Sequence, residues 1–198
     1  MLTVAGQSIS ALELVAFVSG LLSVWLTQRM HIANWPVGMF NVVCFAFLFV
    51  DAKLYADALL QVAFFVLGAY GWWSWVRTKA TAGSLPVTRA SLAEIFAVVL
   101  LALVFTALAA STLMAWTDSP APWPDGSVLV LSLLATWAQA RRRIESWVLW
   151  IVVDLISIPL YWSRSLPLTA ILFAVFLVLC IAGLLSWRKR LVPVGAAA

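Results

Sequence analysis

Seven long apolar stretches, separated by short polar segments, limit the fold of this 198-residue sequence more than any other feature. Hydrophobic residues make up 65% of the chain and charged residues only 10%, which is more apolar surface than a soluble domain of this size can bury. In lipid a segment must satisfy its own backbone hydrogen bonds, so each stretch is expected to be a helix. The stretches are Leu12–Arg29, Trp35–Val50, Leu54–Val76, Leu92–Trp116, Asp125–Ala140, Trp147–Trp162 and Leu166–Trp187. The sequence therefore predicts an all-α membrane protein with seven transmembrane helices, and excludes a soluble globular domain and a nucleic-acid-binding module.

The second half of the sequence repeats the first in a single register, which aligns Glu13 with Asp125. Without gaps, 17 of the 63 residue pairs between 13–75 and 125–187 are identical. The identical pairs include Trp25 with Trp137, Trp35 with Trp147, Gly71 with Gly183 and Trp75 with Trp187. Residues 12–76 and 125–187 are thus expected to be two three-helix repeats, joined by a linker helix at 92–116. Three helices and one linker make an even number of crossings, so both repeats enter the membrane in the same direction, as in transporters with parallel repeats.

The basic residues predict the orientation of these helices. With seven crossings, ten basic residues fall on one side of the membrane and two on the other. The richer side holds Arg29, Arg77, Lys79, Arg89, Arg141, Arg142, Arg143, Arg188, Lys189 and Arg190, and the poorer side holds Lys53 and Arg164. Because cytoplasmic loops carry the excess of Lys and Arg, the N-terminus is expected outside and the C-terminus in the cytoplasm. The absence of Lys and Arg from Met1–Ser10 argues against a signal peptide.

Four polar side chains lie inside the predicted helices, where each is costly and needs an explanation. Asn41 and Asp154 lie near the middle of the second and sixth stretches, and Asp57 and Gln61 lie one helical turn apart in the third. A carboxylate at the centre of a bilayer costs about 2.5–3.5 kcal/mol on insertion scales, which makes Asp154 the most informative of the four. Asn41 and Gln61 have an alternative role, because amides often join two membrane helices.

Aromatic residues accompany Asp154 along its helix. Trp147, Trp150 and Tyr161 share a helical stripe with this carboxylate by their spacing of three, four and seven. Such a set predicts an aromatic pocket that binds a cationic ring by cation–π and Coulomb attraction. The alternative is a structural hydrogen bond, or an ion pair between Asp154 and Arg164. Tyr70 belongs to a second aromatic group, at 70–75, which is expected to form an interfacial belt with at most some members in a cavity.

The remaining reactive side chains predict neither an enzyme nor a metal or cofactor site. The two cysteines, Cys44 and Cys180, both lie in apolar stretches, where buried packing is the expected role. His31 is the only histidine and lies in a predicted loop, so neither a histidine-rich metal site nor a Ser–His–Asp set within the membrane is expected.

Four sequence strings resemble the Pnu-type vitamin transporters, whose best-known branch, PnuC, carries nicotinamide riboside. They are NWPVG at 34–38, LYAD with LQ at 54–61, YGWWSW at 70–75 and ESWVLW at 145–150. The resemblance covers about 13–187 and implies a three-plus-one-plus-three helix fold similar to SWEET sugar transporters. It also implies facilitated diffusion, trapping of the vitamin by phosphorylation in the cell, and a homotrimer in the inner membrane. The family's vitamin-site glutamine corresponds to Gln61, and Asn41 and Trp150 are further site residues on the same grounds.

The choice of vitamin depends on Asp154. The riboside branch often has asparagine at this position, and the family also contains thiamine and riboflavin branches. Nicotinamide riboside and thiamine each carry a fixed positive charge, whereas riboflavin is neutral, so a buried carboxylate favours a cationic vitamin. We therefore expect uptake of nicotinamide riboside, with thiamine as the alternative and riboflavin disfavoured. A membrane scaffold without a ligand is the alternative outside the family.

Overall fold

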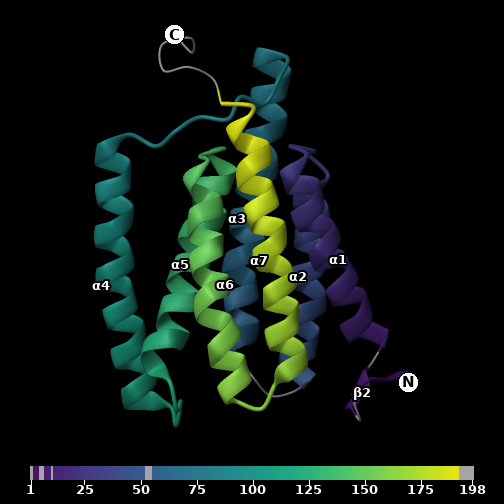
Figure 1. The fold of residues 1–198 in the computed structure, drawn as a ribbon, viewed down its shortest axis with the longest axis vertical. Coiled ribbons are helices and arrows are strands. Elements are labelled where there is room, and N and C mark those ends of the chain that lie inside the picture. Colours follow the sequence, from purple (N-terminus) through teal and green to yellow (C-terminus); the bar gives the residue numbers. More distant parts are fainter. Residues whose placement is uncertain (1, 5–6, 10, 52–54, 192–198) are drawn as a thin grey trace. The chain divides into compact units, whose positions relative to one another are not determined.

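The computed structural model describes residues 2–4, 7–9, 11–51 and 55–191, and Figure 1 shows their helical arrangement. Lys53 and Leu54, which the sequence analysis uses, lie outside these ranges. The chain divides into two compact units, Met1–Leu85 and Pro86–Ala198.

The first unit contains a short hairpin and three helices. Strands β1 (Leu2–Val4) and β2 (Gln7–Ile9) pair antiparallel, with Leu2 opposite Ile9. The helices are α1 (Ala11–Gln28), α2 (Asn34–Asp51) and α3 (Tyr55–Ala82). The hairpin was not expected from the sequence, and α3 continues beyond the predicted end at Val76.

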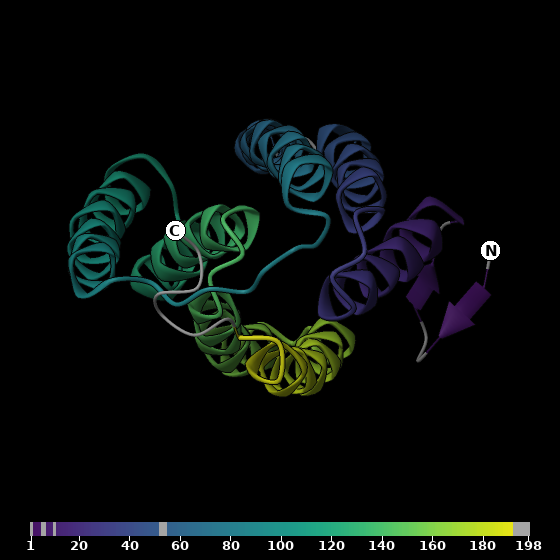
Figure 2. The ribbon, with the colours of Figure 1, turned by 90° about the horizontal axis from the view of Figure 1, so that it is seen from above.

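The second unit contains four helices. They are α4 (Leu92–Trp116), α5 (Pro122–Ala140), α6 (Glu145–Ser163) and α7 (Pro167–Arg188). Within each unit, every helix packs against its neighbour in the sequence, as the view from above shows (Figure 2). The seven helices confirm the predicted all-α class and lie within a few residues of the predicted stretches.

Among the described residues, six of the seven helices are long and apolar enough to cross a membrane, and α5 is the exception. This helix begins with two prolines and carries Asp125, Ser132, Thr136 and Gln139. It lies between α4 and α6 and buries small side chains against them, whereas α4 buries only Ala110 among its described residues. A helix that faces protein on both sides needs fewer apolar side chains than one that faces lipid, which explains its lower hydropathy.

Equivalent residues of the two units make the same aromatic contacts. Trp35 meets Trp75 edge to face, with ring centroids 5.5 Å apart and planes at 85°, and Trp147 meets Trp187 at 5.5 Å and 89°. In each unit a glycine leaves space for one of the two tryptophans. A Cβ atom at Gly71 would overlap the six-membered ring of Trp35, and a Cβ atom at Gly183 would overlap that of Trp147. These contacts join the start of α2 to α3 in the first unit, and the start of α6 to the end of α7 in the second.

The turns before these tryptophans also have matching geometry. Met30 and Arg142, which are equivalent in the repeat, have φ angles of 57° and 58°. In each turn the next residue donates a backbone hydrogen bond of 3.0 or 2.9 Å to the carbonyl of the residue five positions earlier. The guanidinium of Arg29 lies 4.3 Å from the centre of the Trp25 ring, and that of Arg141 lies 5.1 Å from the Trp137 ring.

A polar network ties the segment before α4 to the turn between α5 and α6. Arg143 Nη1 donates to Thr88 Oγ1 at 2.8 Å, and Arg143 Nη2 contacts Glu94 Oε1 at 2.7 Å. Glu145 Oε2 accepts the backbone N–H of Ala90 at 3.0 Å. Glu94 also forms a capping box with Ser91 at the start of α4. Charged hydrogen bonds, as well as apolar packing, therefore hold the start of the linker helix α4 against the turn between α5 and α6.

The glycine–tryptophan contact predicts a loss of stability on Gly183→Ala. Alanine gains up to about 1 kcal/mol in helix propensity over glycine. Overpacking against Trp147 costs about 1–3 kcal/mol and should prevail. We expect a lower thermal unfolding midpoint in detergent. In the Trp147→Leu background the same change should cost little, because the overlapping ring is gone, and an equal cost in both backgrounds would contradict this packing role.

The polar network predicts different effects for two neighbouring arginines. Arg143→Ala removes hydrogen bonds to charged and neutral partners and should lower the free energy of unfolding by about 1–3 kcal/mol. Arg141 lies 3.6 Å from Glu94 and its side chain is 43% exposed, so Arg141→Ala should cost less than about 1 kcal/mol. Thermal unfolding of both variants in one detergent tests the difference, and equal midpoints would contradict it.

Candidate functional site

The polar centre of the second unit is Asp154, near the middle of α6. The residue is 2% exposed, and its Oδ2 atom has no hydrogen-bond partner among the described residues. The thiol of Cys180, on α7, lies near its carboxyl group. Ser157, one helical turn after Asp154, is fully buried, and its hydroxyl is also without a partner in the described part of the chain. We call Asp154, Ser157 and Cys180 the buried polar trio.

Cys180 and Ser157 were not recognised as site residues from the sequence. Cys180 is buried, as expected, and it also lies near the carboxyl group of Asp154. Ser157 could have been found from its spacing of three from Asp154, which places both side chains on one helix face. The contact with Cys180 depends on how α7 packs against α6, and no spacing within α6 indicates it.

The ion pair considered between Asp154 and Arg164 is absent. Arg164 Nη2 instead lies 2.6 Å from Asp125 Oδ2, so the end of α6 is bound to the start of α5. The predicted ion pair is therefore wrong, because Arg164 is engaged near the end of its helix, whereas the alternative of a structural hydrogen bond for Asp154 stays open.

The aromatic stripe of α6 divides between two neighbouring helices. Trp147 is 1% exposed and packs against α7. Tyr161 stacks on Phe173 of α7, with ring centroids 5.1 Å apart and planes at 13°. Trp150 is half-buried and turns toward α5, where its Nε1 donates to Gln139 Oε1 at 3.1 Å.

The predicted site residues of the first unit lie on α2 and α3. Asn41 joins two helices, because its Nδ2 donates to the Ala16 carbonyl at 2.5 Å and to Ser19 Oγ at 3.1 Å. Gln61 is half-buried on α3, and Asp57 is exposed one turn before it. Tyr70 is 39% exposed and lies against Trp73 with ring centroids 6.1 Å apart.

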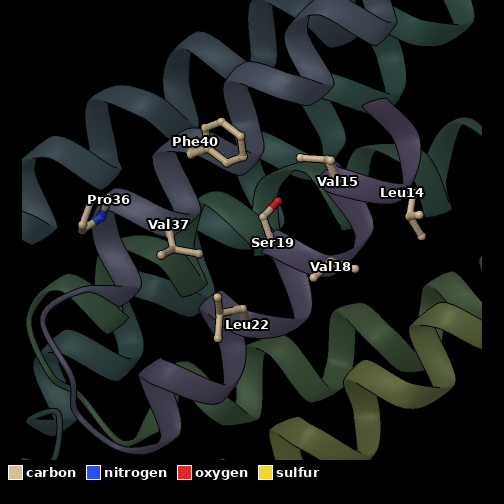
Figure 3. A pocket seen from close by; sticks show the side chains of 8 residues that line it. All are labelled: Leu14, Val15, Val18, Ser19, Leu22, Pro36, Val37 and Phe40. Atoms are coloured by element: carbon tan, nitrogen blue, oxygen red, sulfur yellow. The ribbon is translucent and has the colours of Figure 1, made fainter. Parts of the chain in front are cut away.

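An apolar groove runs between α1 and α2 on the first unit (Figure 3). Its volume is about 590 Å³. The lining residues are Leu14, Val15, Val18, Ser19, Leu22, Pro36, Val37 and Phe40, and none of them is a predicted site residue. Ser19 is the polar member of this set, and its hydroxyl is already bonded to Ala16 and Asn41. The groove therefore offers a polar ligand little to bind.

Metal chemistry has no ligand set in the part of the chain that the structure describes. No group of three or more His, Cys, Asp or Glu side chains is close enough there to hold a metal ion. The buried polar trio supplies a carboxyl, a hydroxyl and a thiol, which suit hydrogen bonding or the neutralisation of a cation.

Comparison with known proteins identifies the family. Residues 10–189 match the family model described as nicotinamide mononucleotide transporter. The chain belongs to this family. It is a membrane transporter and not an enzyme, which confirms the resemblance seen in the sequence strings.

Three relatives cover most of this transporter. It is 30% identical to the riboflavin/roseoflavin transporter RibM of Streptomyces davaonensis, over 90% of this chain and 84% of that protein. It is 26% identical to the nicotinamide riboside transporter PnuC of Escherichia coli, over 92% and 87%. A crystal structure of the vitamin B3 transporter PnuC superimposes with a TM-score of 0.72 at 26% identity, covering 90% of this chain and 81% of that one. The transporter thus has the PnuC fold, and its relatives differ in the vitamin that they carry.

Proposed function

We propose that this transporter takes up nicotinamide riboside across the bacterial inner membrane by facilitated diffusion. Phosphorylation of the vitamin inside the cell would then trap it and maintain the inward gradient. The proposal is supported by the match to the E. coli nicotinamide riboside transporter over 87% of that protein's length.

The observation that carries the choice of vitamin is the unpaired carboxyl group of Asp154. The salt bridges among the described residues join Arg164 to Asp125, and Arg141 and Arg143 to Glu94, so none of them reaches Asp154. An ionised carboxylate in this apolar interior needs a positive partner. The pyridinium ring of nicotinamide riboside carries a fixed positive charge and would supply this partner.

The proposed contact requires the helices to move. Asp154 is buried between α6 and α7, so the described conformation is one in which the vitamin does not reach the carboxylate. Alternating access in transporters exposes a midplane site by moving one bundle of helices against another.

Riboflavin is the second candidate, because the identity to the riboflavin/roseoflavin transporter RibM is 30%, against 26% to E. coli PnuC. Riboflavin is neutral and would leave the Asp154 carboxylate without a counter-charge. Thiamine remains the cationic alternative on charge alone. The charge of the ligand therefore separates the candidates more sharply than sequence identity does.

The membrane arrangement proposed with this function has two parallel three-helix repeats, 12–76 and 125–187, with 92–116 as the linker. It places the N-terminus outside and the C-terminus in the cytoplasm, as the ten-to-two division of basic residues favours. This orientation requires α5 to cross the membrane. With 19 residues, like α6, it extends about 28 Å, close to the thickness of the hydrocarbon. A homotrimer is proposed from the family resemblance.

Gln61 is proposed to bind the ribose or carboxamide of the vitamin. Gln61→Ala would leave a polar group of the ligand unpaired, at a cost of about 1–3 kcal/mol. The affinity for nicotinamide riboside should fall roughly ten- to a hundredfold, with an unchanged unfolding midpoint in the absence of ligand. Calorimetric titration measures the affinity. Wild-type affinity in this variant would assign Gln61 to helix packing.

Asp154 is proposed to recognise the charge of the vitamin, which Asp154→Asn tests. The change keeps the size of the side chain and removes its charge, so a cationic ligand should lose about 1–3 kcal/mol of binding free energy. A neutral ligand should lose little. Thermal stabilisation by nicotinamide riboside, its reduced uncharged form, thiamine and riboflavin should be compared in both proteins, since ligands that bind the folded state raise its stability.

The four ligands give distinct outcomes. Stabilisation of the wild type by nicotinamide riboside, reduced in Asp154→Asn, supports the proposal. Stabilisation by riboflavin alone would assign the transporter to riboflavin. An equal loss for the charged and uncharged forms of the riboside would show that Asp154 acts through structure.

A further inference from the structure

The apolar groove between α1 and α2 plays no part in the proposed function. On its α1 side, Val15, Val18 and Leu22 are 43%, 54% and 43% exposed. Phe40 of α2 lines the same space and is also exposed (Figure 3). In a membrane such a face is covered either by another helix or by lipid.

The linker helix α4 covers the equivalent face of the second unit. In the register of the repeat, Leu14 and Val18 of the groove correspond to Gly126 and Val130 of α5. Val130 is only 8% exposed, and a Cβ atom at Gly126 would lie 3.1 Å from the backbone nitrogen of Ala110 in α4. The described part of the first unit has three helices and no counterpart of α4. The groove therefore lies where the first unit lacks a helix that the second unit has.

A stacked tryptophan and arginine lie beyond one end of the groove. Trp25 follows Val18 and Leu22 along α1 at steps of three and four, so it lies on the groove side of the helix. The Trp25 side chain is 41% exposed, and the guanidinium of the exposed Arg29 lies 4.3 Å from the centre of its ring. Tryptophan and arginine at the end of a membrane helix are typical of the level of the lipid headgroups.

We propose that the groove binds a phospholipid with an anionic headgroup. One acyl chain lies between α1 and α2, and Arg29 binds the phosphate of the headgroup. Stacking on Trp25 engages the face of the guanidinium, whereas a phosphate is bound through the N–H donors at its edge. This inference does not depend on which vitamin the transporter carries.

The length and the charge of this site fit a lipid in one leaflet. Val15 lies ten residues before Trp25. That separation is about 15 Å along a helix, half of the roughly 30 Å thickness of the hydrocarbon. In the proposed orientation Arg29 lies on the cytoplasmic side, where the anionic lipids of the inner leaflet attract basic residues. An acyl chain needs no polar partner, which suits a groove whose Ser19 hydroxyl is already hydrogen-bonded.

Native mass spectrometry of the full-length transporter in detergent measures the binding of added lipid. Phosphatidylglycerol and phosphatidylcholine with identical acyl chains are the two probes, because they differ in the net charge of the headgroup. We expect tighter binding of phosphatidylglycerol to the wild type. Arg29→Gln should lower this affinity about fivefold, the effect of one basic residue near anionic lipid, and leave the affinity for phosphatidylcholine unchanged. Arg141→Gln is the matched control, because Arg141 stacks on Trp137 in the same way beside a face that α4 covers, and its lipid affinity should equal the wild type.

A change inside the groove tests the acyl chain separately from the headgroup. Val18→Trp fills the groove from an exposed position and should weaken the binding of both lipids, with the unfolding midpoint in the absence of lipid unchanged. Leu22→Trp, one turn nearer to Trp25, should do the same and guards against a folding defect in one variant.

The outcomes separate this lipid site from its alternatives. Equal affinity of the wild type for the two lipids, or an equal loss in Arg29→Gln and Arg141→Gln, would overturn the headgroup contact. Lipid binding that neither groove variant weakens would overturn the site and leave the face to another helix or a second copy of the chain. Lipid binding as expected, together with a failure to bind nicotinamide riboside, would overturn the proposed function and leave the lipid site standing.

Discussion

The hydrocarbon of the membrane removes water as a hydrogen-bond partner, and the whole structure depends on that constraint. Every crossing segment must be a helix, and the helices can associate only through close packing and a few polar contacts. In this transporter the closest packing is the tryptophan that lies over a glycine, Trp35 on Gly71 and Trp147 on Gly183. The first pair joins α2 to α3 and the second joins α6 to α7, each near the turn that precedes the tryptophan. The same tryptophan–glycine contact occurs at equivalent positions of both units, as expected if a three-helix segment was duplicated.

The polar groups of the two units have diverged where the packing has not. Asn41 bridges α1 and α2 with both of its measured hydrogen bonds, so its cost in the membrane is offset by a structural role. Asp154, by contrast, keeps one carboxylate oxygen without a partner among the described residues. A group whose hydrogen-bonding capacity is unused in a buried position is where a ligand can gain most. Function is thus expected in the differences between the units, and stability in their similarities.

Relatives of similar identity carry vitamins of different charge, and this shows why overall identity is a weak guide to the substrate. Identities of 26% and 30% are too close to each other to decide between the two vitamins. Substrate choice depends on a few side chains in the interior. One carboxylate separates a cationic from a neutral vitamin because its Coulomb energy in a medium of low dielectric exceeds that of a typical hydrogen bond. We therefore propose the buried polar trio as the place where the substrate of this transporter is distinguished from those of its relatives.

The amino-acid sequence alone determined the helical class, the approximate ends of the seven helices and the register of the repeat, because apolar periodicity and rare residues such as tryptophan are local signals. It also indicated Asp154, since a carboxylate in an apolar stretch is conspicuous without a structure. Only the tertiary structure decided what that carboxylate contacts. In the tertiary structure Arg164 pairs with Asp125, and Cys180 of α7 lies near Asp154 of α6. Trp150 faces α5, whereas Tyr161 faces α7. Those contacts depend on how the helices rotate and pack against one another, and the spacing within a single helix does not specify that rotation.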